Sequence, residues 1–72
     1  MKHNQELITY FDNYIMDHID EELVLIPISQ VYRDFDKKYS INDIIFLFFT
    51  YYLAIGNEVY IDNEERYLIY CI

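Results

Sequence analysis

The longest apolar run of the chain, between Ser40 and Gly56, has the composition and the end signals of a single helix. Ser40 can accept a hydrogen bond from the first turn, and Asp43 places a carboxylate near the positive end of the helix dipole. From there to the glycine only Thr50 is polar. Gly56 stands where a helix often ends in a left-handed cap. We therefore predict a helix between these two end signals.

This helix has two apolar arcs. At about 100° per residue, one arc is wide enough to be the core face. It consists of Ile41, Ile44, Ile45, Phe48, Tyr52 and Ile55, flanked by Leu47 and Tyr51. Phe46, Phe49 and Leu53 form a second arc beside Asn42, roughly opposite the first. Leaving three such side chains in water forgoes about 1.5–3 kcal/mol each. Either the N-terminal helix covers the second arc, or the arc is a surface for a partner or for self-association.

The segment from Asn4 to about Asp20 is predicted to be the first helix, because its apolar residues recur at helical spacing. These residues are Leu7, Ile8, Phe11, Ile15 and Ile19, with Tyr14 at the edge. The apolar run from Leu23 to Ile28 is short and rich in β-branched residues, which favours a strand. Pro27 has no N–H to donate, so we expect this strand at an edge or end position.

A second helix is predicted from Gln30 to Tyr39, with Ser29 as its N-cap. Its apolar residues again keep helical spacing. They are Val31, Tyr32, Phe35 and Tyr39.

The chain beyond the glycine predicts a hairpin. Glu58 to Asp62 alternates in polarity, with Val59 and Ile61 on one face. The four polar residues 63–66 connect this strand to a second one, Tyr67 to Ile72. The second strand is apolar on both faces, so we expect it to lie between other elements rather than at an open edge.

The 72 residues allow one domain, residues 1–72, of α+β class: three helices, a short strand and a C-terminal β-hairpin. A chain of this size is marginally stable without a cross-link or a partner. Cys71 is the only cysteine, so no internal disulfide forms, and we expect its thiol to fill the core. A free thiol and the lack of a secretory signal after Met1 predict a cytoplasmic protein.

The formal net charge of −8 disfavours nucleic acid and anionic membranes as partners. It suits a basic protein surface, such as the groove of an enzyme that handles nucleic acid. The alternative is that the charge only keeps an apolar protein soluble. Five carboxylates are candidates for docking to a basic partner and are equally compatible with a solvated surface. They are Asp17, Asp20, Glu21, Glu64 and Glu65.

The order helix, short strand, helix, helix, hairpin resembles that of winged helix-turn-helix domains, from Asn4 to Ile72. The resemblance rests on the order and lengths of the elements and on no sequence motif. It implies that the helix that starts after Ser40 takes the place of the helix that enters the DNA major groove, and that the hairpin is the wing. The positions that would face the groove are then Asn42, Phe46, Phe49 and Leu53.

At these positions the chain departs from the DNA-binding pattern, because base reading needs cationic or amide side chains and only Asn42 qualifies. Aromatic and aliphatic side chains at such a surface are instead typical anchors of protein interfaces. We therefore predict a protein-binding surface. It is formed by Asn42, Phe46, Phe49, Leu53 and Tyr60.

Catalytic chemistry is not indicated. His3 and His18 are the only histidines, and no serine, histidine and acid arrangement can be argued from them. A single glycine leaves no phosphate-binding loop. We expect neither a catalytic site nor a bound cofactor or metal.

Two functions remain open. The first is a non-enzymatic accessory subunit or inhibitor of a larger protein, such as a DNA replication protein or a phage or mobile-element target whose DNA site the acidic chain mimics. The second is a homodimeric winged-helix regulator of transcription. In that case the DNA-binding residues would be Arg33, Lys37, Lys38 and Arg66.

Overall fold

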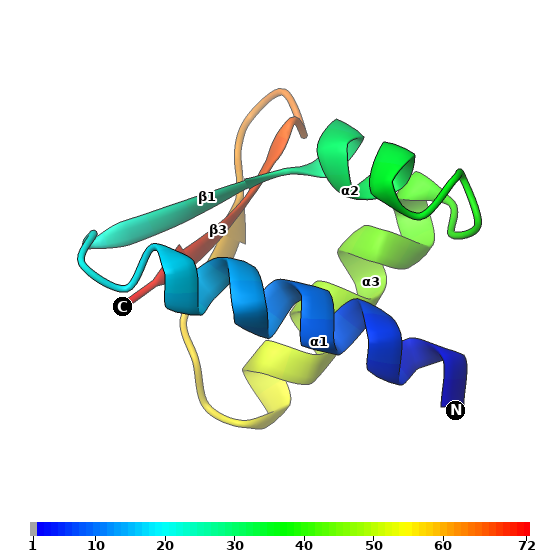
Figure 1. Ribbon diagram of the computed structural model, residues 1–72. Helices are drawn as coiled ribbons and strands as arrows, with labels where there is room; N and C mark the ends of the chain where they lie inside the picture. The colour runs from blue at the N-terminus through cyan, green and yellow to red at the C-terminus, as the bar shows by residue number, and fades with distance from the viewer. Residues whose placement is uncertain (1) are drawn as a thin grey trace.

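The computed structural model describes the backbone of residues 2–72 and the side chains of residues 5–72 (Figure 1). The helices are α1 (Lys2–Asp17), α2 (Ile28–Asp34) and α3 (Ile41–Ala54), and the strands are β1 (Leu23–Pro27), β2 (Val59–Ile61) and β3 (Tyr67–Cys71). The predicted α+β class is confirmed, with three helices, a short strand and a C-terminal hairpin. This element order is compatible with a winged-helix arrangement, and membership of that superfamily stays a prediction.

The strands form one antiparallel sheet with the order β1-β3-β2. Pro27 thus lies on an edge strand and β3 lies in the centre, as predicted. Val24 and Ile26 pair with Tyr70 and Leu68, and their side chains are directed to the helices and buried. The helices cover this inner face of the sheet (Figure 1).

The first helix ends at Asp17, three residues before the predicted end, and residues 18–20 form a turn. The backbone N–H of Glu21 donates to the carbonyl of His18 in this turn. Carboxylates at a helix C-terminus oppose the helix dipole, which favours the early end. Because Ile19 lies beyond the helix and is exposed, its assignment to the core face of the first helix is wrong.

The second helix is shorter than predicted and begins earlier. The Ile28 N–H donates to the Arg66 carbonyl at 2.9 Å, so the chain turns from β1 into α2 with Pro27 at the N-cap position. Ser29 therefore lies inside the first turn, and its assignment as the cap is wrong. The helix ends before Tyr39 because Asp36 and Lys37 take left-handed conformations, with φ of 51° and 63°.

Both predicted ends of the third helix are confirmed. The Ser40 hydroxyl accepts the Asp43 N–H at 3.0 Å. At the other end Gly56 has φ of 89°, its N–H donates to Leu53 O, and the Asn57 N–H donates to Tyr52 O. This pair of hydrogen bonds is the Schellman closure of a helix.

The buried side chains form one core cluster between the helices and the inner face of the sheet. Phe11 of α1 meets Phe48 of α3 edge-on, with ring centroids 5.2 Å apart, and Phe48 packs against Tyr52 at 5.1 Å. Ile41 and Ile55 are exposed at the two ends of α3, so their assignment to the core face is wrong. The core face is therefore narrower than predicted and centres on Phe48. None of the helices in residues 2–72 combines the length and apolar character needed to cross a membrane.

Candidate protein-interaction surface

The second apolar arc of α3 is largely open to solvent. Phe46 is 70% exposed and Leu53 is 55% exposed. Asn42 is exposed, whereas Phe49 is half-buried, with its ring edge-on to Phe48 at 5.9 Å. The interpretation in which the N-terminal helix covers the arc is therefore wrong for Phe46 and Leu53. We refer to Asn42, Phe46, Phe49 and Leu53 as the α3 stripe.

The α3 stripe is held on a rigid support. Both ends of α3 are capped by hydrogen bonds, and its opposite face is locked into the core through Ile44, Phe48 and Tyr52. A surface built on a fixed helix loses little conformational entropy when it binds a partner. The stripe is thus preorganised.

Asp12 of α1 places a carboxylate against α3. Its Oδ1 accepts the Tyr52 hydroxyl at 2.5 Å. Burial raises the pKa of Tyr52 well above its ordinary value, and the hydrogen bond and charge of Asp12 raise it further. The hydroxyl therefore remains a donor at neutral pH.

The sequence analysis did not identify Asp12, which lies outside the apolar positions of the first helix, as a partner of α3. A signal for the pairing was present, because a tyrosine on a core face needs a partner for its hydroxyl. Which carboxylate supplies that partner depends on the packing of α1 on α3, which the pattern of either helix alone does not determine.

Tyr60 does not join the α3 stripe. It lies on β2 between Val59, which is buried, and Ile61, which is half-buried against the core. Successive side chains of a strand point to opposite faces, so Tyr60 lies on the outer face of the sheet, away from α3. Its hydroxyl donates to the Glu58 carboxylate, which raises the pKa of Tyr60. Its grouping with the four residues of α3 in one surface is wrong.

The outer face of the sheet is a second exposed apolar area. Leu23 and Leu25 of β1 are about as exposed as Tyr60 of β2, and all three point away from the helices. Cys71 of β3 is half-buried, and burial raises the pKa of its thiol. The expectation that this cysteine fills the core is wrong, because its register puts it opposite Leu23. The sequence held no signal for the two faces of β1, because the apolar run from Leu23 to Ile28 does not alternate in polarity.

The predicted docking carboxylates are divided between the two ends of the sheet. Asp17, Asp20 and Glu21 lie where α1 leads into β1, whereas Glu64 and Glu65 lie in the turn between β2 and β3. The strand β1 runs between these ends, a length of about 17 Å for five residues. The five carboxylates therefore do not form a single docking surface.

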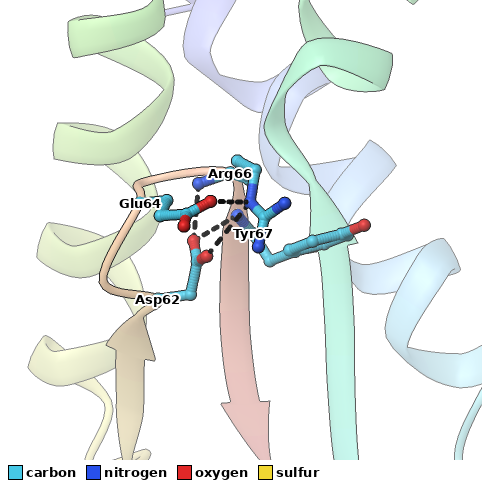
Figure 2. Close-up of polar contacts among 4 residues, drawn as sticks. All are labelled: Asp62, Glu64, Arg66 and Tyr67. Carbon is cyan, nitrogen blue, oxygen red and sulfur yellow. Dashed lines mark hydrogen bonds and ion pairs between the residues drawn. The ribbon is translucent and has the colours of Figure 1, made fainter.

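The hairpin turn is ordered by its own polar contacts (Figure 2). Asp62 accepts the backbone N–H groups of Arg66 and Tyr67 at 2.5 and 2.8 Å. The Arg66 guanidinium lies 3.1 Å from the Glu64 carboxylate and 3.6 Å from that of Asp62. The hydrogen bond from the Tyr67 N–H holds the pKa of Asp62 below its ordinary value, with smaller contributions from the turn backbone and Arg66.

The four cations of the DNA-binding alternative come from three segments. Arg33 lies on α2 and donates to the Gln30 amide oxygen at 3.4 Å. Lys37 and Lys38 lie in the loop before α3, where Lys38 forms an ion pair with the Glu6 carboxylate. Arg66 lies in the hairpin turn with its two carboxylates. Ion pairing thus offsets part of the positive charge that this alternative requires.

Comparison of the chain with protein-family models, with curated proteins and with solved structures finds no match. The arguments for function therefore rest on the surfaces described above.

Proposed function

We propose that the protein is a small, non-enzymatic interaction module that docks on a larger protein through the α3 stripe. The observation that carries this proposal is the exposure of Phe46 and Leu53 on a helix that is otherwise locked in place. Large apolar side chains on a rigid surface are typical anchors of protein interfaces. Complete burial of an exposed side chain of this kind is worth about 1.5–3 kcal/mol, and the exposed parts of Phe46 and Leu53 would contribute a corresponding share to the stability of a complex.

The charge of the chain supports a partner with a basic surface. A net charge of −8 speeds encounter with a positively charged groove and opposes association with nucleic acid. Proteins that process nucleic acid carry such grooves. An accessory subunit of a replication protein and an inhibitor that occupies a DNA site by charge mimicry both belong to this class. The lone thiol of Cys71 supports the cytoplasm as the compartment.

The regulator alternative has weaker support. In a winged-helix arrangement α3 would take the place of the recognition helix, but its exposed surface carries Phe46 and Leu53 instead of cations. Two of the four candidate cations, Lys38 and Arg66, are paired with carboxylates of the same chain.

Site-specific photocrosslinking tests the proposal. Phe46 is replaced by the photoreactive analogue p-benzoylphenylalanine, and the chain is irradiated in the cells from which it derives. The same analogue at Met16, which is 64% exposed on α1, is the matched control. We expect one adduct, heavier than the chain, from position 46 and none from position 16.

The mass of the adduct separates the alternatives. An adduct with twice the mass of the chain shows self-association, as the regulator alternative requires. A nucleic-acid adduct also supports that alternative. Equal labelling from both positions, or none from position 46, contradicts the proposed function.

A further inference from the structure

The four residues of the α3 stripe have the spacing of a helix–helix contact. The steps between Asn42, Phe46, Phe49 and Leu53 are four, three and four residues. This alternation of four and three is the seam by which helices pack side by side in coiled coils. A straight apolar seam of this kind can receive a second α-helix that lies alongside α3 and packs its own apolar side chains between these residues.

Carboxylates flank this seam on both sides. Each residue of a helix is rotated by about 100° around the helix axis from the one before it. On this basis Asp43 lies about 60° around the axis from Phe46, on one side of the stripe, and Tyr52 lies about 60° from Phe49, on the other side. The Tyr52 hydroxyl holds the Asp12 carboxylate at that second side. Positions beside an apolar seam select the partner by charge. An approaching helix with Lys or Arg beside its own apolar seam would meet these two carboxylates.

We propose that the occupant of the α3 stripe is an amphipathic helix of the partner protein with basic residues on both sides of its apolar seam. This inference rests on the proposed function and specifies the partner. A second copy of the chain does not have this chemistry. Pairing two α3 stripes would bring Asp12 and Asp43 of both copies to one interface and join two molecules of charge −8.

Asn42 is the polar end of the seam. The apolar contact with a partner helix therefore comes from Phe46, Phe49 and Leu53.

Two designed peptides test the proposal by calorimetry with the full chain. Both are about four heptads long, with leucine at the seam positions. One carries lysine at the flanking positions and the other carries glutamate. We expect the basic peptide to bind, its affinity to fall as salt is added, and the acidic peptide not to bind.

Variants of the chain connect this binding with the α3 stripe. Phe46→Ser should weaken binding of the basic peptide by about tenfold or more. Met16→Ser removes a similarly exposed apolar side chain from α1 and should leave the affinity unchanged. Leu53→Ser provides a second test within the stripe. Circular dichroism checks that each variant is folded.

Three results would overturn the inference: no binding of the basic peptide, equal binding of both peptides, or an affinity insensitive to Phe46→Ser and Leu53→Ser. If the basic peptide fails while position 46 still crosslinks to another protein in cells, the partner is not a basic helix and the proposed function stands. If position 46 forms no adduct in cells, the proposed function fails whatever the peptide does.

Discussion

The Tyr52 hydroxyl on α3 donates a hydrogen bond to the Asp12 carboxylate on α1, joining residues 40 positions apart. It connects the two helices at the point where Tyr52 also contacts Phe11. We expect Tyr52→Phe to lower the free energy of unfolding by about 0.5–1.5 kcal/mol, because it removes one hydrogen bond and keeps the ring.

Urea denaturation of Tyr52→Phe, Asp12→Asn and the double variant measures this contribution. If the two groups act through their contact, the cost of the double variant is smaller than the sum of the single costs. Additive costs would contradict a coupled pair.

Alkaline pH should destabilise the protein from about pH 10 upward. Burial raises the folded-state pKa of Tyr52, so below the unfolded value of 10.0 both states keep the proton and stability is unaffected. Above that value the unfolded state loses the proton first, and stability falls until the folded pKa is reached. Ultraviolet absorbance reports tyrosinate, because ionisation of the phenol changes its absorption spectrum. We expect part of the tyrosinate absorbance to appear only when the protein unfolds. Ionisation of all the tyrosines before unfolding would contradict this prediction.

The two faces of α3 should respond in opposite ways to truncation. Phe48→Ala removes a fully buried ring from the core and should cost about 3–5 kcal/mol, enough to unfold much of a domain this small. Phe46→Ala should change the free energy of unfolding by less than about 0.5 kcal/mol, because its ring is mostly in solvent. Thermal melts of both variants give the comparison, and a similar loss for both would mean that Phe46 is a core residue.

Acid should loosen the hairpin turn through Asp62. Its folded pKa lies below the ordinary value of 3.8, mainly because its carboxylate accepts the Tyr67 N–H. The resulting stabilisation is complete above the unfolded pKa and is lost as pH falls through the folded one. Asp62→Asn should therefore lower stability at neutral pH and flatten the acid unfolding curve. Glu64→Gln, in the same turn, is the control with a smaller expected change.

Gly56→Ala should lower the free energy of unfolding by about 1–2 kcal/mol. The cost comes from the backbone alone, because φ is 89° and an added Cβ would meet no atom within 4 Å. Asn57→Ala, at the next position, keeps the closure because only its N–H takes part. Equal stability of wild type and Gly56→Ala would mean that the helix closes differently.

How much of this fold could be predicted depended on whether a signal was local. The ends of α3 follow from Ser40 and Gly56, whose effects act within one helical turn, and both were found. The end of α2 depends on the left-handed conformations of Asp36 and Lys37. Neither aspartate nor lysine requires this conformation, so the residue types gave no sign of it. The length of that helix was therefore overestimated, although Tyr39 still reaches the core.

The candidate surface was predictable in part for the same reason. Helical spacing alone placed Asn42, Phe46, Phe49 and Leu53 on one arc, and the structure leaves most of that arc uncovered. Tyr60 was added wrongly, because which face of the sheet the helices cover is a tertiary property. The contact between Asp12 and Tyr52 likewise depends on the packing of two helices.

The central position of β3 has a consequence for the order of events during synthesis. Both of its neighbours, β1 and β2, precede it along the chain, and neither pairs with the other. On the ribosome, Leu23–Pro27 and Val59–Ile61 emerge with no strand to pair with until residues 67–71 have been added. The sheet therefore cannot form until residues 67–71 have left the ribosome, and a nascent chain stalled before Tyr67 would expose two unpaired apolar strands to chaperones.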